Sequence, residues 1–330
     1  MTVHVALFGA GRIGLTHARA MASIDNARID AVHDPVEEAA AHAASLTGAR
    51  QASIEEILVD PAIHAVIVAT PTDLHAGQVE AAARAGKAVF CEKPIDLDVE
   101  RVRACLDVVR MTGASLMIGF NRRFDPSFAA LRRRLQEGAI GKVELVQITS
   151  RDPAPPGVDY LRRSGGLFRD MMVHDFDMAR FLLNEDVVEV SATGSALVDP
   201  AIAEVGDVDT ATATLRTASG RIAVITNSRR ATYGYDQRAE VHGSLGMLAV
   251  GNPALTTVSE ADGDGFRQGP LHDFFMTRYT EAYRLELEHF VHTIKAGTPP
   301  SPDGTDGLRA LELADAAWTS LLEKRIVRLG

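Results

Sequence analysis

The chain of 330 residues contains only two cysteines, Cys91 and Cys105. Two cysteines are too few for a disulfide framework and lack metal-ligand spacing, so we expect both thiols to pack in the core of a protein from a reducing compartment. Long apolar runs are also absent: no segment approaches the roughly 18 apolar residues of a membrane span. The N-terminus lacks the longer apolar stretch and cleavage site of a signal peptide. These absences predict a cytoplasmic protein.

Basic residues are in the minority. The chain has 34 Lys and Arg against 44 Asp and Glu, a formal net charge of −10 at pH 7. Because a net negative protein repels phosphate backbones, we expect no nucleic-acid partner. No serine or cysteine nucleophile motif and no clustered metal ligands occur, so we expect no metal. The remaining composition is that of a globular protein, with 46% hydrophobic residues, and the length favours two domains.

Short apolar runs alternate with helical patterns over residues 1–120. The pattern predicts strands at residues 3–8, 29–33, 65–69, 88–91 and 115–119, and helices at residues 12–23, 35–45, 76–85 and 99–111. Such alternation is typical of an α/β fold in which crossover helices cover both faces of a doubly wound parallel sheet. We therefore expect a Rossmann domain at residues 1–120.

The pattern changes after residue 120. It predicts helices at residues 126–136, 170–183, 278–296 and 306–323, and strands at residues 143–149, 187–197, 210–216, 221–228 and 238–242. Several of these strands are separated by short turns, as in antiparallel hairpins. Residues 121–330 are therefore expected to form an α+β domain with a largely antiparallel open sheet. The Gly- and Asp-rich segment 252–274 fits no pattern, and its role stays open.

The first predicted strand leads into Gly9-Ala10-Gly11-Arg12-Ile13-Gly14, a GxGxxG motif that opens a helix. Gly9 permits a tight turn, Gly11 leaves room for a pyrophosphate, and Gly14 lets helix and strand pack closely. The N–H groups at the start of the helix face the anion. The motif and its setting predict a dinucleotide site that includes Arg12 and Ile13.

Asp34 lies at the end of the second predicted strand. A carboxylate at this position accepts hydrogen bonds from the adenosine ribose. Glu37 and Glu38 follow it in place of a basic residue, so a 2′-phosphate would meet negative charge and NAD is expected over NADP. As the alternative, Asp34 is the N-cap of the following helix.

Two further predicted strands deliver residues to the same edge. Thr70 and Pro71 follow one strand and His75 opens the helix after it, while Glu92 and Lys93 follow the other. We expect all five residues at the cofactor crevice. The Lys93 ammonium can donate to a substrate hydroxyl or lower the pKa of a nearby acid; the alternative is a surface ion pair between Glu92 and Lys93.

The segment GGLFRDMMVHDFD at residues 165–177 runs from two glycines into a predicted helix. At about 100° per residue, Asp170, His174 and Asp177 fall in one stripe of that helix. A histidine one turn from a carboxylate is oriented by it and can accept a hydroxyl proton as a ketone forms. With a nicotinamide cofactor and Lys93, this pair predicts alcohol oxidation. The alternative is a capping Asp170 and a core His174.

The sequence resembles the Gfo/Idh/MocA oxidoreductases in the motifs GAGRIG, TPTDLH, AGKAVFCEKP, GFNRRFD and GGLFRDMMVHDFD. The resemblance spans nearly the whole chain. Within the family, SRDP, YGYDQRAEVHG and RYTEAYRLELEHF make the chain most similar to the inositol 2-dehydrogenases. Asn121 departs from the residue that other members often carry there.

The resemblance implies NAD-dependent oxidation of myo-inositol, or of a related isomer, to a 2-keto-inosose. Lys93 would contact the reacting hydroxyl, and Asp170 and His174 would form the proton-accepting dyad. It further implies that other polar residues line the polyol pocket: Arg122, Asp152, Asp177, Tyr235 and Tyr283. Members of the family commonly assemble as tetramers through the open face of the second-domain sheet, so a homotetramer is expected.

Two alternatives stay open at the level of sequence. The same catalytic residues suit a dehydrogenase of a pyranose sugar such as glucose. In a different class, the chain would be a non-catalytic dinucleotide sensor, which would have no need of Lys93 and His174.

Overall fold

The computed structural model describes residues 2–330, which divide into two compact units. Unit 1 comprises Met1–Asp125 and Thr280–Leu311, and unit 2 comprises Pro126–Tyr279 and Glu312–Gly330. This division differs from the split predicted at residue 120, because a long C-terminal segment packs with the N-terminal sheet. Within residues 2–330, none of the helices combines the length and the hydropathy of a membrane span.

Unit 1 is built on a six-stranded parallel sheet in the order β3-β2-β1-β4-β5-β6. Its strands are β1 (Val3–Phe8), β2 (Ala27–His33), β3 (Arg50–Gln51), β4 (Ala65–Val68), β5 (Ala88–Glu92) and β6 (Leu116–Gly119). The central strands are apolar runs buried on both faces, as the continuous hydrophobic pattern predicts. Cys91 and Cys105 are free, buried thiols of this core.

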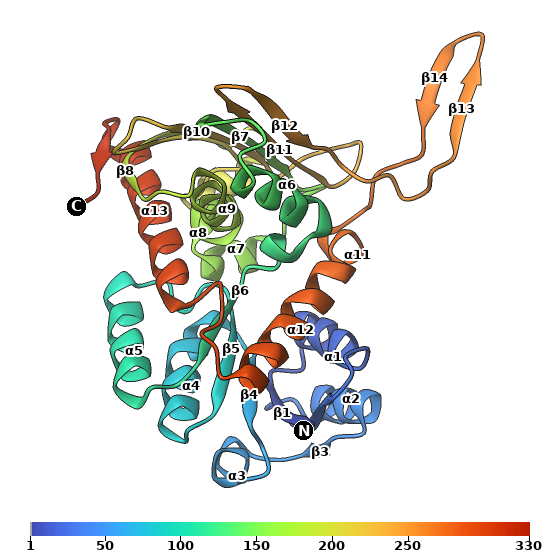
Figure 1. The fold of residues 1–330 in the computed structure, drawn as a ribbon, viewed down its shortest axis with the longest axis vertical. Coiled ribbons are helices and arrows are strands. Elements are labelled where there is room, and N and C mark those ends of the chain that lie inside the picture. Colours follow the sequence, from blue (N-terminus) through green and yellow to red (C-terminus); the bar gives the residue numbers. More distant parts are fainter. Residues whose placement is uncertain (1) are drawn as a thin grey trace. The chain divides into compact units, whose positions relative to one another are not determined.

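Helices cover both faces of this sheet (Figure 1). The helices are α1 (Arg12–Met21), α2 (Glu37–Thr47), α3 (Ile54–Val59), α4 (Thr72–Arg84), α5 (Val99–Thr112), the 3-10 helix η1 (Asn121–Phe124), and α12 (Thr280–Ala296). Helix α12 packs on α1 and η1. After α12 the chain bonds to β6, since the Ile118 N–H donates to the Pro302 carbonyl (3.1 Å). These contacts place residues 280–311 in unit 1.

Unit 2 contains a seven-stranded sheet in the order β12-β11-β7-β10-β9-β8-β15. Its strands are β7 (Val143–Arg151), β8 (Val187–Ser195), β9 (Thr210–Thr217), β10 (Ile222–Ser228), β11 (Asp236–Gly243), β12 (Gly246–Val250) and β15 (Val327–Arg328). All neighbours are antiparallel except β7 and β10, which pair in parallel. The predicted fold class, a Rossmann sheet followed by an α+β unit, is confirmed.

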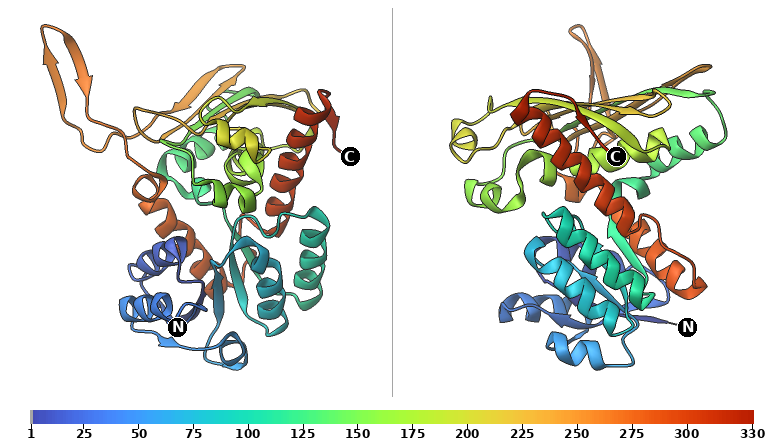
Figure 2. Two further views of the ribbon diagram at one scale, coloured as in Figure 1. Left: turned by 180° about the vertical axis from the view of Figure 1, so that it is seen from behind. Right: turned by 90° about the vertical axis from the view of Figure 1, so that its left-hand side faces the viewer.

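The helices of unit 2 lie on one face of its sheet (Figures 1 and 2). They are α6 (Pro126–Gln136), α7 (Val158–Ser164), α8 (Gly166–Asp170), α9 (Val173–Leu183), α10 (Pro200–Glu204), α11 (Phe275–Arg278), and the second part of α13 (Gly304–Glu323). Alternate residues of β9 and β10 enter the core beneath these helices, including Ala213, Leu215 and Ile225. The intervening side chains, such as Thr212 and Thr214, are exposed on the other face.

The segment that fits no sequence pattern contains a separate hairpin. Strands β13 (Ser259–Asp262) and β14 (Gly265–Gln268) pair only with each other among the described residues. All eight strand residues are exposed, and the hairpin projects away from the sheet of unit 2 (Figure 1). Its composition reflects this exposure, because glycine and aspartate do not build a core.

Candidate active site

The GxGxxG motif forms the predicted turn between β1 and α1. Gly9 has φ +92°, and a Cβ there would lie 2.5 Å from the Ala69 carbonyl oxygen. A Cβ on Gly14 would lie 2.0 Å from the Gly9 carbonyl oxygen, whereas a Cβ on Gly11 would have no neighbour within 4 Å. Helix α1 begins at Arg12 without a side-chain cap. The glycines therefore bring strand and helix together and leave the space at the helix start that a pyrophosphate requires.

Asp34 follows directly after β2. Its carboxylate accepts hydrogen bonds from the Ala10 N–H (2.6 Å) and the Val36 N–H (2.9 Å). The N-cap of α2 is Val36, so Asp34 is not the N-cap. Asp34 instead joins the glycine turn to the end of β2, and its half-buried carboxylate retains acceptor sites for a ribose.

His75 connects two strand ends at this edge of the sheet. Its Nε2 lies 2.7 Å from the Thr70 carbonyl oxygen, and its Nδ1 lies 2.8 Å from the Pro94 carbonyl oxygen. The Thr70 hydroxyl donates to Gln78 (2.7 Å), and Pro71 is the N-cap of α4. Since both ring nitrogens face backbone carbonyls, His75 serves to fix the loops after β4 and β5.

Glu92 and Lys93 lie at the end of β5, and Glu92 is a buried residue, not an exposed surface one as the alternative hypothesis requires. Glu92 is buried and lies 2.7 Å from Nε2 of His17 on α1. Its second oxygen accepts a hydrogen bond from the Lys93 N–H (3.2 Å), and its carboxyl packs against Gly119 of β6. Lys93 is half-buried. The sequence singled out Glu92 without indicating His17 as its partner.

Two of the predicted pocket residues also belong to unit 1. Arg122 is buried in η1, and Tyr283 is buried in α12. The Tyr283 ring lies edge-on to the His17 ring with centroids 5.6 Å apart. Unit 1 therefore contains all the residues predicted for the cofactor, together with Arg122 and Tyr283 of the predicted polyol pocket.

The prediction of a single helix at residues 170–183 is wrong in one respect, because two successive helices meet in this segment. Helix α8 ends at Asp170, and α9 begins at Val173. The N–H groups of Met171 and Met172 both donate to the Leu167 carbonyl (3.0 and 2.9 Å), which closes α8. Met171, Met172 and Leu167 are all buried, so apolar packing on several sides overrides the single-helix periodicity. Asp170 and His174 consequently lie on successive helices.

Side chains from two other segments of the chain contact the Asp170 carboxylate. The Tyr160 hydroxyl donates to Oδ1 (2.9 Å), and Nη2 of Arg229 lies 3.4 Å from Oδ2. Arg229 is almost fully buried, so its charge acts on Asp170 with little screening by water. Because Asp170 ends α8, it is not an N-cap. No local signal links Tyr160 or Arg229 to Asp170 in the sequence.

Helix α9, which carries His174 and Asp177, is anchored to the sheet by Asp175. This fully buried carboxylate lies 2.5 Å from the Ser150 hydroxyl of β7 and accepts a hydrogen bond from Asn227 of β10 (2.8 Å). Asp177 is also buried, while His174 is half-buried. Two strands therefore fix the helix turn that presents His174.

Tyr235 and Asp152 lie at the ends of sheet strands. The Asp152 N–H donates to the Ser228 carbonyl (3.0 Å) just beyond β7 and β10. Tyr235 is buried just before β11, with its ring 6.0 Å from the Tyr279 ring. Unit 2 thus contains five of the predicted residues: Asp152, Asp170, His174, Asp177 and Tyr235.

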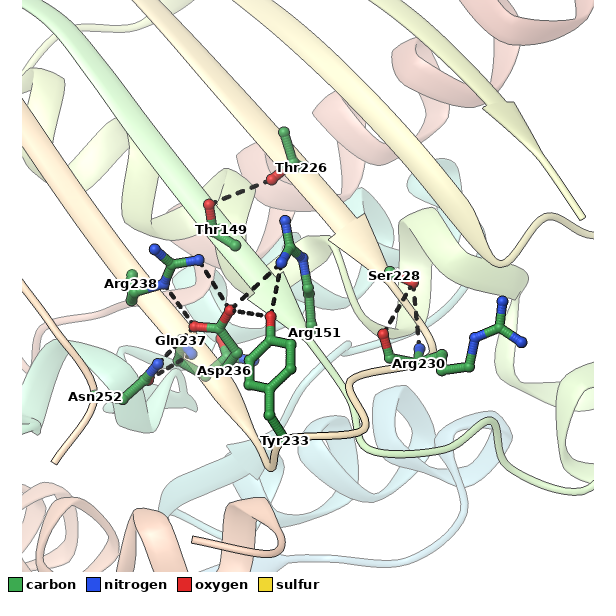
Figure 3. A network of polar contacts seen from close by, with 10 residues as sticks. All are labelled: Thr149, Arg151, Thr226, Ser228, Arg230, Tyr233, Asp236, Gln237, Arg238 and Asn252. Atoms are coloured by element: carbon green, nitrogen blue, oxygen red, sulfur yellow. Dashed lines mark hydrogen bonds and ion pairs between the residues drawn. The ribbon is translucent and has the colours of Figure 1, made fainter. Parts of the chain in front are cut away.

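A buried carboxylate organises the strand that follows Tyr235 (Figure 3). Asp236 accepts hydrogen bonds from Arg238 (2.7 and 3.0 Å), Tyr233 (2.7 Å) and Asn252 (2.5 Å). Burial alone would raise the pKa of Asp236, but the hydrogen bonds from Arg238, Asn252 and Tyr233 outweigh it and lower that pKa. This network joins the start of β11 to the end of β7 through Arg151 (3.8 Å).

Two protein-family models match the chain, one in each unit. Residues 3–120 match "Oxidoreductase family, NAD-binding Rossmann fold", and residues 128–249 match "GFO/IDH/MocA C-terminal domain". The chain is 56% identical over its full length to the inositol 2-dehydrogenase of Rhizobium meliloti, also covered in full. The chain belongs to the Gfo/Idh/MocA family. It is an oxidoreductase, as predicted.

Two solved structures share the fold of this chain over nearly its full length. A myo-inositol dehydrogenase from Corynebacterium glutamicum is 43% identical with a TM-score of 0.96, over 100% of this chain and 99% of that one. A scyllo-inositol dehydrogenase from Lactobacillus casei, solved with NAD(H) and scyllo-inositol, is 28% identical with a TM-score of 0.92, over 99% of both chains. The predicted cofactor, NAD, is confirmed, and the open space at Gly11 and the Asp34 carboxylate suit it.

Proposed function

We propose that this oxidoreductase is an NAD-dependent inositol 2-dehydrogenase, which oxidises myo-inositol or a related isomer to a 2-keto-inosose. The observation that carries the proposal is the extent of the likeness. The 56% identity to the inositol 2-dehydrogenase of Rhizobium meliloti covers the whole chain, and therefore both units. A protein that shared only a cofactor site would be expected to resemble it mainly in unit 1.

In the proposed reaction, Lys93 donates a hydrogen bond to the reacting hydroxyl, and His174 accepts its proton. Asp170 orients His174 as the second member of the dyad, and its bonds to Tyr160 and Arg229 support this role. A near-neutral imidazole suits proton acceptance from an alcohol that becomes a ketone. NAD, when bound, supplies the oxidant for the carbinol carbon.

The substrate of this reaction carries a hydroxyl on every ring carbon. We assign the polyol pocket to residues that offer carboxylate, guanidinium and phenol groups: Arg122, Asp152, Asp177, Tyr235 and Tyr283. A substrate that fails to pair these groups leaves polar atoms buried without partners, which penalises its binding. The pocket therefore selects for the pattern of hydroxyl groups.

The cofactor would be held by residues at the carboxyl edge of the unit 1 sheet. These residues are Gly9, Gly11, Arg12, Ile13, Gly14, Asp34, Thr70, Pro71, His75, Glu92 and Lys93. Unit 2 would supply the other substrate groups and the assembly surface, while Lys93, Arg122 and Tyr283 come from unit 1. The face of its sheet that the helices leave uncovered supports assembly into a homotetramer, and we assign the protein to the cytoplasm.

Initial rates of NADH formation across inositol isomers and common hexoses test the proposed function. We expect a cyclitol, myo-inositol first, to give the highest kcat/KM. If a pyranose such as glucose exceeds the best cyclitol by at least about tenfold, the assignment to inositol is wrong. If no substrate is turned over although NAD binds, the sensor hypothesis replaces it.

A further inference from the structure

Three titratable side chains from three elements of unit 1 meet in its interior. They are His17 of α1, Glu92 of β5 and Glu286 of α12, and one polar atom of each lies within 4.8 Å of the other two. All three are buried. His17 and Glu286 have no part in the reaction proposed above, yet both lie beside the residue that precedes Lys93.

Both oxygens of Glu92 have defined partners. His17 Nε2 lies 2.7 Å from Oε1, and the Lys93 N–H donates to Oε2 at 3.2 Å. The His17 ring is held in turn by Phe90 and Tyr283, whose ring centroids lie 5.0 and 5.6 Å away, both edge-on. One oxygen of Glu92 therefore accepts a hydrogen bond from the Lys93 backbone, and the other lies within hydrogen-bond distance of the His17 ring.

Glu286 has a different environment. Its side chain is 0% exposed, and neither carboxyl oxygen has a hydrogen-bond partner among the described residues. Burial, and after it the charge of Glu92, raise the pKa of Glu286 well above the usual value. Ionising both of two carboxyl groups this close in a buried site is costly, because the surroundings screen their repulsion poorly.

The other elements packed on α12 bring no cation that pairs with Glu286 among the described residues. From η1, Arg123 is paired with Asp306 (3.0 Å), and Arg122 is buried in the same turn. His289, one turn further along α12, lies against Phe124 with ring centroids 5.4 Å apart. Among the described residues, Glu286 therefore has no ion-pair partner.

We propose that His17, Glu92 and Glu286 form a buried cluster with a single negative charge, and that this cluster is a positioning device for Lys93. The proton resides on Glu286, which leaves Glu92 as the anion that accepts from His17 and from the Lys93 backbone. A second charge on Glu286 would repel Glu92 and disturb the strand end that carries Lys93. The inference rests on the proposed function, because that function gives Lys93 its role.

Infrared spectroscopy in H2O and D2O tests the proton directly, without substrate. We expect the protein at pH 7 to show a carboxylic-acid C=O band that shifts in D2O and disappears in Glu286→Gln. Glu288→Gln is the matched control, since Glu288 is exposed on the same helix and pairs with Arg284 (3.1 Å); it should retain the band. A protein without this band at pH 7 would overturn the inference. If Glu286→Gln fails to fold, Glu286→Met carries the same test.

The pH dependence of kcat tests the positioning role. In the parent enzyme, ionisation of Glu286 adds the second charge, so kcat should fall as the pH rises through this ionisation. Glu286→Gln cannot ionise, and we expect its alkaline limb to lie at least about one pH unit higher, a difference of 1.4 kcal/mol per unit. If kcat falls over the same pH range in the parent and in Glu286→Gln, the cluster does not position Lys93.

A bound cation would be the competing account of the same cluster. Calorimetry with Mn²⁺ or Zn²⁺ alone distinguishes the two: binding to the parent protein and not to Glu286→Gln would replace the proton with a metal and overturn the inference. Failure to oxidise any cyclitol would instead contradict the proposed function and leave the infrared result unaffected.

Discussion

The two units fix their functional residues in different ways. In unit 1, the residues assigned to the cofactor lie at or just after the ends of β1, β2, β4 and β5, and backbone groups hold several of them, as the bonds of Asp34 and His75 illustrate. In unit 2, side chains from distant segments hold the carboxylates of Asp170 and Asp175. A site built on backbone can be found from local sequence, whereas a site built on distant side chains cannot.

The largest expected effect concerns His174 in unit 2. We expect His174→Ala to lower kcat by about 10² to 10⁴, the usual range for a lost general base, while the Kd for NAD changes little. NADH absorbance gives the first quantity and calorimetric titration with NAD the second. His242→Ala, on the exposed part of β11, is the control. An unaltered kcat in His174→Ala would remove this residue from the mechanism.

The polar network around Asp236 predicts the next effect. Asp236→Asn should lower the free energy of unfolding at pH 7 by about 2 kcal/mol, because a neutral amide at this buried position accepts the hydrogen bonds of Arg238 and Tyr233 more weakly than the carboxylate does. The lowered pKa of Asp236 fixes the sign of the pH dependence. The stabilisation is present above the unfolded pKa of about 3.9 and is lost as pH falls further through the folded pKa.

Urea unfolding at pH 7 and pH 3 measures this dependence. The difference in unfolding free energy between parent and Asp236→Asn should narrow at the lower pH. A difference that is equal at both pH values would show that the charge of Asp236 does not contribute. Asp262→Asn, in the exposed hairpin, should have little effect at either pH.

A third effect compares cofactor selectivity in unit 1. Asp34→Ala should reduce the preference for NAD over NADP by about tenfold, the value of one charged hydrogen bond of roughly 1.5 kcal/mol. The ratio of kcat/KM with the two cofactors measures it, and Asp25→Ala, in an exposed turn, serves as control. Equal ratios in variant and parent would contradict the assigned role of Asp34.

The smallest expected effect concerns the hydrogen bond from Tyr160 to the Asp170 carboxylate. Tyr160→Phe removes one hydrogen bond (2.9 Å) from that carboxylate and should lower kcat about three- to tenfold, with a smaller change in the KM for inositol. Steady-state kinetics across inositol concentrations separates the two parameters. A change confined to KM would place Tyr160 in substrate binding instead of in support of the dyad.

Much of unit 1 was predictable from the sequence. The predicted strand at residues 3–8 and the helix start at Arg12 coincide with the structure, because buried parallel strands read as continuous apolar runs. That residues 280–311 belong to unit 1 was not predictable from the sequence. Helix α12 is amphipathic, and periodicity shows that a face is buried without showing which partner buries it.

In unit 2, the helix and strand types were largely predictable and their connections were not. The break between Asp170 and Val173 escaped prediction because Met171 and Met172 are good helix formers whose burial depends on tertiary packing. The parallel pairing of β7 with β10 and the contact of Arg229 with Asp170 join residues far apart in the chain. No local pattern encodes such pairs.

The C-terminal part of the chain, which is synthesised last, contributes to both units. Strand β15, at Val327–Arg328, completes the sheet of unit 2 by pairing with β8, and α12 completes the interior of unit 1. Neither unit can therefore complete its folding as soon as its first segment, residues 2–125 or 126–279, has been synthesised. Unit 1 therefore lacks α12, and the sheet of unit 2 lacks β15, until the residues from Thr280 onward have been synthesised.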